Sequence, residues 1–325
     1  MSGDRTRGVG EKTVAGSREP GAGERGVAIG DPNAVPVSGY RLPVTGSTAN
    51  RIDQRFAELK SAGRTGLIPF VTAGDPLPDA VVPLMHALVA AGADLLELGM
   101  PFSDPMADGP VIQHSSERAL ARGIGLRHVL GWVGDFRKSD ATTPIVLMGY
   151  LNPIEIYGYE RFAQAAVAAG VDGALIVDCP LEESATIAAL RAAGLRQIFL
   201  AAPTTADRRL AEVCERAEGF LYYVSFAGIT GADRLDLAPV QARVAAIKSR
   251  TQTPVAVGFG VRDAASAAAI AQFADAVVIG SALVEKLANS GTPHEVCERA
   301  KGFLAPIREG LDAAQVDAGA SAHAA

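Results

Sequence analysis

The residues best suited to catalysis are an acid inside an apolar run and a second acid in the loop that follows. Glu97 lies within Asp94-Leu-Leu-Glu-Leu-Gly99, and Asp108 follows in a loop rich in proline and glycine. A buried carboxylate is costly without partners, and strand-end acids with perturbed pKa values are common catalytic groups. The pattern predicts acid–base chemistry by this pair. The alternative is a structural Glu97 held by an arginine or by backbone N–H groups.

A second group of residues predicts a phosphate site. Glycines end or follow successive apolar runs late in the chain, at Gly231, Gly258, Gly260 and Gly280, and Ser281 comes directly after the last. Glycine lets backbone N–H groups approach an oxyanion closely. Three successive loops of this kind favour phosphate binding, although each glycine alone could be an ordinary turn residue.

Apolar runs and alanine-rich helical patterns alternate along the chain, and this alternation must position both groups. Parallel strands need crossover helices, so the repeat predicts a (β/α)8 barrel (TIM barrel), with an extra helix near 52–62 before the first strand. A doubly wound open sheet is the rival, but no GxGxxG follows the first run. The predicted strands are 66–72, 94–99, 144–148, 173–177, 197–201, 220–224, 254–257 and 276–279. The predicted helices are near 52–62, 80–91, 114–137, 158–169, 182–193, 206–217, 238–250, 263–272 and 294–311.

The patterns also divide the chain into three parts. Residues 1–49 are rich in Gly, Pro, Ser and mixed charge, and we predict a disordered extension there. Residues 50–312 hold the repeat and are the expected catalytic barrel. Residues 313–325 form an alanine- and glycine-rich tail that we expect to be flexible.

Composition excludes several classes of function. The net charge is −6, which argues against nucleic-acid binding. No apolar run is long enough to span a membrane, and the start of the chain lacks a signal-peptide core. The three cysteines are widely spaced and predict a reducing, cytoplasmic setting without disulfides.

The basic residues limit the mechanism. None of the six lysines ends a predicted strand, so a Schiff base has no good candidate. The five histidines do not cluster at strand ends, so we expect no metal site. The electron sink should therefore come from the substrate, with help from carboxylates and from the nearby Tyr222.

These motifs together resemble the tryptophan synthase α subunit family. The resemblance covers about residues 50–312 and departs at Phe226, where some members carry arginine. The motifs that carry it, in the order of the family, are Phe70-Val-Thr-Ala-Gly-Asp-Pro76, Glu97-Leu-Gly-Met-Pro-Phe-Ser-Asp-Pro-Met-Ala-Asp-Gly-Pro110, Tyr150-Leu-Asn-Pro153, Asp178-Cys-Pro-Leu-Glu-Glu-Ser184, Ser225-Phe-Ala-Gly-Ile-Thr-Gly231, Gly258-Phe-Gly260 and Gly280-Ser281.

The resemblance implies a lyase that cleaves indole-3-glycerol phosphate to indole and glyceraldehyde 3-phosphate by a retro-aldol reaction. It implies that Glu97 is the general acid and base, and that Asp108 accepts a hydrogen bond from the indole N–H. It also implies that Thr230 closes a loop over the substrate and orders Asp108. The expected substrate contacts are Phe70, Leu147, Tyr222 and Phe259 for indole, and Gly231, Gly258, Gly260, Gly280 and Ser281 for phosphate.

The resemblance further implies a partner. The α subunit works in an α2β2 complex whose β subunit receives the indole and carries pyridoxal phosphate, while this chain is expected to bind no cofactor of its own. The expected docking surface comprises Pro101, Asp104, Pro105 and Met106 with Asn152 and Pro153.

Three other functions remain open at this stage. An indole-glycerol-phosphate-forming synthase should use a strand-end lysine, which is missing. A catalytically silent barrel acting as an effector would have no need of both Glu97 and Asp108. A glycosidase could use two carboxylates but would leave the phosphate-type glycines unexplained.

Overall fold

The structure, a computed structural model, describes residues 50–183, 188–224, 237–258 and 260–323, without the side chains of 316–323. Its described strands are all parallel and form one sheet. They are β1 (Gly66–Thr72), β2 (Leu96–Gly99), β3 (Ile145–Gly149), β4 (Gly173–Ile176), β5 (Arg196–Gln197), β6 (Phe199–Ala201), β7 (Leu221–Val224), β8 (Val255–Gly258) and β9 (Ala276–Ile279).

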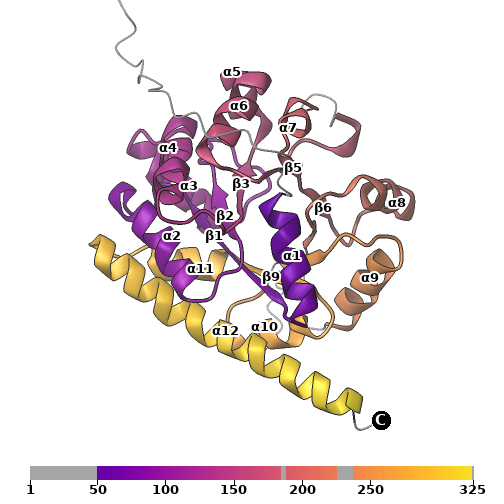
Figure 1. Cartoon of the computed structure of the whole chain (residues 1–325). Helices are drawn as coiled ribbons and strands as arrows, with labels where there is room; N and C mark the ends of the chain where they lie inside the picture. Colours follow the sequence, from indigo (N-terminus) through magenta and orange to yellow (C-terminus); the bar gives the residue numbers. More distant parts are fainter. Residues whose placement is uncertain (1–49, 184–187, 225–236, 259, 324–325) are drawn as a thin grey trace, which may run out of the picture. The chain divides into compact units, whose positions relative to one another are not determined.

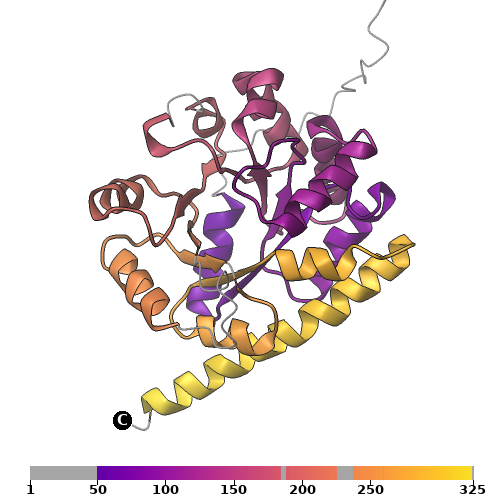
Figure 2. The same cartoon turned by 180° about the vertical axis from the view of Figure 1, so that it is seen from behind.

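Helices surround this sheet, as Figure 1 shows from one end and Figure 2 from behind. The long helix α12 runs along one side and packs on α2, α10 and α11. The helices are α1 (Arg51–Ser61), the 3₁₀ turn η1 (Pro78–Ala80), α2 (Val81–Ala90), α3 (Pro110–Ala121), α4 (Leu126–Arg137), α5 (Leu151–Tyr157), α6 (Tyr159–Ala169), α7 (Ala188–Ala192), α8 (Asp207–Arg216), α9 (Ala238–Lys248), α10 (Ala264–Ala271), α11 (Ser281–Leu287) and α12 (Pro293–His323).

The sheet closes into a barrel, which confirms the predicted fold over an open sheet. The strand β1 pairs with β2 on one side and with β9 on the other. Only Ile198 separates β5 from β6, and its N–H donates to the Ala174 carbonyl of β4 at 2.9 Å. Because β5 pairs with β4 and β6 with β7, the two pieces act as one strand of an eight-strand barrel.

Side chains alternate between the inside of the barrel and the layer of helices. Inward residues such as Val146, Leu175 and Phe220 share a cluster with Ile52 and Phe56 of α1. The rings of Phe56 and Phe220 lie 5.6 Å apart. The predicted extra helix α1 therefore fills the N-terminal end of the barrel. The other face of each strand packs against the surrounding helices in a larger cluster.

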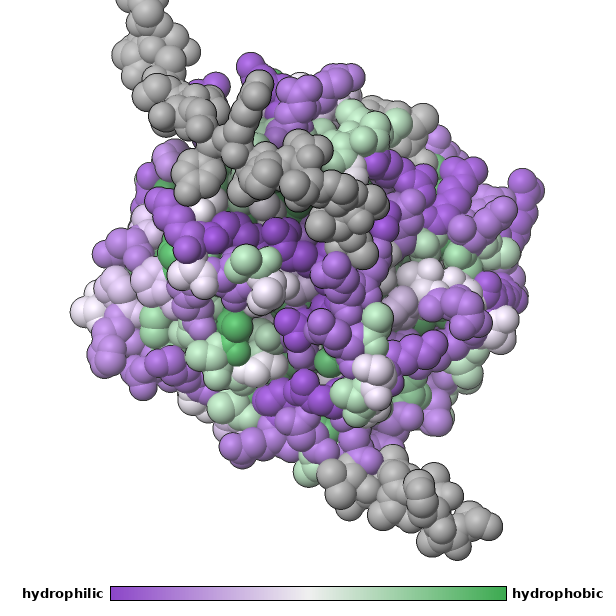
Figure 3. Space-filling view, in the orientation of Figure 1, coloured by the Kyte–Doolittle hydropathy of each residue, from purple (hydrophilic) through white to green (hydrophobic). Residues whose placement is uncertain are grey.

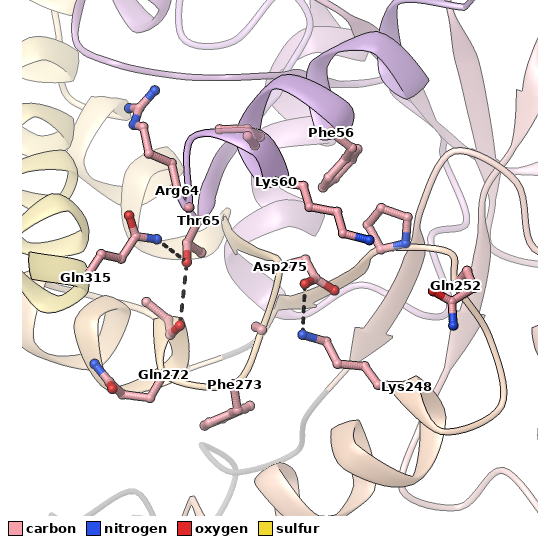
Figure 4. Close-up of a pocket in the computed structure, with 15 residues that line it drawn as sticks. Phe56, Lys60, Arg64, Thr65, Lys248, Gln252, Gln272, Phe273, Asp275 and Gln315 are labelled. Atoms are coloured by element: carbon pink, nitrogen blue, oxygen red, sulfur yellow. Dashed lines mark hydrogen bonds and ion pairs between the residues drawn. The ribbon is translucent and has the colours of Figure 1, made fainter. Parts of the chain in front are cut away.

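Three aspartates tie the starts of the strands together at this same end. Asp94, Asp172 and Asp275 each accept a hydrogen bond from the N–H of the first or second residue of the preceding strand, at 3.0, 2.8 and 2.8 Å. Each also pairs with a cation on a helix, as Lys248 does with Asp275 at 2.8 Å. Figure 4 shows the Lys248–Asp275 pair on the wall of a surface pocket of about 610 Å³.

Several helices differ from the sequence prediction. The helix predicted over 114–137 is two helices, because the chain turns at Gly123, whose φ is 75°. The short helices α5 and α11 were not predicted. Helix α12 continues to His323, beyond residue 313, where we placed the start of the flexible tail. The extension 1–49 lies outside the described residues, so its disorder remains a prediction.

Within the described ranges, none of the helices combines the length and the apolar character that crossing a bilayer needs.

Candidate active site

A cavity of about 290 Å³ opens at the carboxyl ends of the strands, opposite α1. Nine of the predicted site residues are among the described residues, and seven of them line the cavity: Phe70, Glu97, Asp108, Tyr222, Gly260, Gly280 and Ser281. Leu147 and Gly258 do not line it. Thr230, Gly231 and Phe259 lie outside the described residues.

Glu97 lies in β2 and is only 1% exposed. Neither of its carboxylate oxygens has a hydrogen-bond partner among the described residues. Burial, with a smaller contribution from the charge of Asp108, raises the pKa of Glu97 to about 8. The structure therefore does not place an arginine or backbone donor on Glu97, and the side chain is poised to carry a proton at neutral pH.

Asp108 lies in the loop of residues 100–109, which we call the Asp108 loop. Its backbone N–H donates to the Pro105 carbonyl at 3.0 Å, and its own carbonyl accepts from the Gln113 side chain at 2.9 Å. Burial raises the pKa of Asp108 to about 6, against the lowering effect of a hydrogen bond with Tyr150. The two acids therefore have separated pKa values, so near neutral pH Glu97 is protonated while Asp108 is largely ionised.

Tyr222 and Gly258 form a close pair on neighbouring strands. Tyr222 is buried in β7 and lines the cavity, and burial followed by the charges of Glu97 and Asp108 raises its pKa. A Cβ atom at position 258 would meet the Tyr222 hydroxyl at 2.2 Å. We therefore correct the interpretation of Gly258, which makes room for the tyrosine rather than lining the cavity.

The glycines after β8 and β9 lie on one wall of the cavity. Gly260 has a φ of 81°, which favours glycine, and Gly280 precedes the first residue of α11, Ser281. The N–H groups in the first turn of a helix have no acceptor within that helix. This wall, with Val261 and Ala282 beside the glycines, is suited to an anion such as a phosphate.

Leu147 is a correction to the predicted substrate contacts. It is fully buried in the cluster between the sheet and the helices, whereas its neighbour Met148 lines the cavity. Successive residues of a strand point to opposite faces, so only one of the two can face the barrel interior. Met148 replaces Leu147 in the set of cavity residues.

Most residues of the apolar cavity wall were not predicted from the sequence. Inward-facing positions two residues apart on each strand supply it, so the alternation from the inward residue Val146 would have pointed to Met148. Ala107 and Ile112 come from the Asp108 loop and from α3, where no strand period helps. The missed lining residues are Ala107, Gly109, Ile112, Met148, Val177, Leu200, Ala202, Val224, Val261, Val278 and Ala282.

The described residues of this site offer neither a set of metal ligands nor a lysine for a Schiff base. The described residues contain no set of three or more His, Cys, Asp or Glu side chains that could hold a metal ion. No lysine or histidine is among the described residues that line the cavity. The chemistry available from the described side chains is that of two carboxylic acids and a tyrosine in an apolar chamber.

Fold and site together define a (β/α)8-barrel enzyme with an acid pair at the carboxyl ends of its strands. Comparison with known proteins then gives the family. A sequence model described as "Tryptophan synthase alpha chain" matches residues 56–310. The tryptophan synthase alpha chain of Xylella fastidiosa (strain M12) is 60% identical over 265 residues, which is 81% of this chain and 99% of that one.

Solved structures of similar fold belong to the same family. The tryptophan synthase subunit alpha of Legionella pneumophila str. Paris has a TM-score of 0.76 and 44% identity, over 82% of this chain and 99% of that one. A chain of the aminoacrylate-bound tryptophan synthase from M. tuberculosis has a TM-score of 0.72 and 34% identity, over 81% of this chain and all of that one. The chain belongs to the tryptophan synthase alpha chain family, as its motifs predicted. It is a lyase of tryptophan biosynthesis, and the family reaction is cleavage of indole-3-glycerol phosphate.

Proposed function

We propose that Glu97 and Asp108 carry out the cleavage of indole-3-glycerol phosphate in this chain. The observation that carries the proposal is Glu97, an acid that has no hydrogen-bond partner among the described residues and lines the same apolar cavity as a second acid. Such a group is costly to keep unless it has chemistry to do.

In the proposed steps Glu97 gives one proton to the substrate and takes up another from it. The protonated Glu97 donates to C3 of the indole ring, which leaves the ring cationic. Asp108 accepts a hydrogen bond from the indole N–H and stabilises that charge. The bond between C3 and the glycerol carbon then breaks, and its electrons restore the aromatic ring. Glu97 removes the hydroxyl proton from the glycerol carbon, which becomes the aldehyde of glyceraldehyde 3-phosphate.

The cavity offers an apolar surface for the indole ring of the substrate and a separate glycine wall for its phosphate. Phe70, Met148 and Tyr222 offer apolar surface around the acids for the indole ring. Backbone N–H groups at Gly260, Gly280 and Ser281 would hold the phosphate. Closure of the loop through Thr230 and Gly231, and the effect of Phe226, concern residues outside the described ranges and remain predictions.

Indole release from indole-3-glycerol phosphate by the purified chain tests the proposal. Wild-type chain should release indole slowly alone, while Glu97→Gln should lose the activity, because an amide cannot shuttle the proton. Asp108→Asn should also be much slower, because it loses the charge that stabilises the cationic ring. Wild-type rates in both variants would overturn the roles of the two acids, and no cleavage by wild type would overturn the substrate.

We further propose that the chain works in the cytoplasm in an α2β2 complex with a β subunit that holds pyridoxal phosphate. The family implies a β-subunit partner. Two large apolar side chains are exposed in the segments that follow β2 and β3, Met106 at 84% in the Asp108 loop and Ile156 at 76% in α5. They flank the predicted surface of Pro101, Asp104, Pro105, Asn152 and Pro153. Exposed apolar side chains of this size suit a protein contact.

Affinity for a purified β subunit, measured by titration calorimetry, tests this surface. Met106→Glu and Ile156→Glu should each weaken binding at least about tenfold, because a charge would lose its water in the interface. Val167→Glu is a matched control, since Val167 is 40% exposed on α6 and lines a pocket at the other end of the barrel. Equal affinity for all four proteins would place the contact elsewhere.

A further inference from the structure

Tyr150 links the Asp108 loop to the barrel. It follows β3 directly and precedes the first residue of α5, and it is only 3% exposed. The position is 43 residues from Ala107 in sequence. A buried tyrosine needs a partner for its hydroxyl, and here both partners belong to the Asp108 loop.

The Tyr150 hydroxyl contacts two neighbouring residues of the Asp108 loop, Ala107 and Asp108. It accepts a hydrogen bond from the backbone N–H of Ala107 at 3.0 Å. The Asp108 side chain lies beside the same hydroxyl, where a hydrogen bond between the two lowers the pKa of Asp108. One oxygen therefore holds the loop backbone and faces the carboxylate that the proposed reaction uses.

The ring of Tyr150 is itself held in place. It stacks on the ring of Phe102, with centroids 5.2 Å apart and an angle of 30° between the planes. The adjacent N–H of Leu151 donates to the carboxylate of Asp178, after β4, at 2.7 Å. Stacking on one side and a capped helix start on the other leave the hydroxyl little freedom, which is what a group that positions another side chain requires.

We propose that Tyr150 is a positioning residue that fixes the Asp108 carboxylate toward the cavity and keeps it ionised for the cleavage step. The inference rests on the proposed role of Asp108. Tyr150 itself does not line the cavity, so it acts through Asp108 and not on the substrate. A hydrogen bond to a carboxylate favours its charged form.

The titratable groups around the pair are Glu97 on β2, Tyr222 on β7 and Asp178 after β4. Burial and the charge of Asp108 raise the pKa of Tyr150, so its hydroxyl keeps the proton that it donates. The hydrogen bond in turn lowers the pKa of Asp108. Its loss would raise that pKa, and Asp108 would become ionised only at higher pH.

The test is the pH profile of indole release by Tyr150→Phe, measured from about pH 5 to pH 9 with the chain alone. The variant keeps the ring and its stacking on Phe102 but loses the hydroxyl. We expect kcat to fall about 10- to 100-fold with little change in KM, because substrate still binds while Asp108 is misplaced. We also expect the acid limb of the profile to move to higher pH, which a purely structural role would not produce.

Tyr157→Phe provides a matched control. Tyr157 belongs to the same helix α5, and no hydrogen bond from its hydroxyl is found among the described residues, while its ring packs on Phe162 and Arg161. It should keep both the wild-type rate and the wild-type profile. In an Asp108→Asn background, Tyr150→Phe should have almost no further effect, because the two residues act as one unit.

A second variant keeps the test decisive if Tyr150→Phe folds poorly. Fluorine placed beside the hydroxyl, as 3-fluorotyrosine at position 150, makes the hydroxyl a stronger donor, so the acid limb should move to lower pH. An acid limb that stays at the wild-type pH in every folded variant overturns the inference while wild-type activity upholds the proposed function. No cleavage by wild-type chain would instead overturn the proposed function itself.

Discussion

Two buried acids three positions apart, Asp94 just before β2 and Glu97 within it, differ in their partners. Asp94, at the start, accepts hydrogen bonds from the Leu67 N–H at 3.0 Å and from Arg308 at 3.1 Å. Glu97, near the end, has no partner for either oxygen among the described residues. Burial raises the pKa of both, but only around Asp94 do a backbone N–H and arginines oppose it.

The difference shows what each end of the barrel is built for. Asp172 and Asp275 repeat the arrangement of Asp94 at the starts of other strands, each with a backbone donor and a cation. The partners of these acids link the strand starts to the surrounding helices. Glu97 and Asp108 lie at the opposite end, in an apolar cavity. There the raised pKa of Glu97 keeps it protonated at neutral pH, as the proposed reaction needs.

Glu97→Gln should separate activity from stability most strongly. Indole release should fall about 100- to 10,000-fold. The folded state should become more stable at neutral pH, because the pKa of Glu97 is raised from 4.5 to about 8 on folding. Between these values the unfolded wild type releases a proton that the folded state retains, so wild-type stability declines as pH rises from 4.5 to about 8.

Denaturant unfolding at several pH values measures this decline. The variant and wild type should differ least below pH 4.5 and most above about pH 8, by a few kcal/mol. A stability difference that stays constant over this whole pH range would show that the pKa of Glu97 does not rise on folding, and would contradict its burial without a charged partner.

Asp94→Asn should show the reverse result. Removing the charge leaves the buried Arg308 with only the half-exposed Asp312 as an anionic partner, and breaking the buried pair should cost up to about 3 kcal/mol of unfolding free energy. The kcat of the folded fraction should stay within about twofold of wild type, because Asp94 lies at the far end of the barrel. Unfolding curves and indole release by the same preparation check both parts. A large loss of kcat in fully folded protein would show that the two ends are coupled.

The pH dependence of the wild-type chain sharpens the contrast within the active site. The proposed reaction requires an ionised Asp108 and a protonated Glu97, whose pKa values are about 6 and about 8. The profile of kcat/KM should therefore rise as pH increases through about 6 and fall as it passes about 8, with each limb approaching tenfold per pH unit. Asp108→Asn should remove the acid limb and leave the basic limb. An acid limb that persists in Asp108→Asn would belong to another group.

Much of this arrangement could be predicted from the sequence, for identifiable reasons. The alternation of apolar runs and helical patterns is a local signal, so the barrel and its eight strand positions followed from it. Glu97 was conspicuous because a charge interrupts an apolar run. Tyr150 gave no such signal, since its role depends on Ala107, a residue 43 positions away that the fold brings beside it. Helix α5 was missed because it has 7 residues and contains Pro153.

The smallest predicted effects distinguish the two faces of β3. Met148→Val should raise KM about threefold to tenfold, since it removes about 1 kcal/mol of apolar contact with the indole ring, and should leave stability nearly unchanged at the cavity wall. Leu147→Val removes a similar volume from the packed layer of helices, so it should cost about 1 kcal/mol of unfolding free energy with KM unchanged. Steady-state kinetics and unfolding curves of both variants give the comparison. A raised KM in Leu147→Val with normal kinetics in Met148→Val would return Leu147 to the binding set, against the alternation of side chains that places Met148 in the cavity.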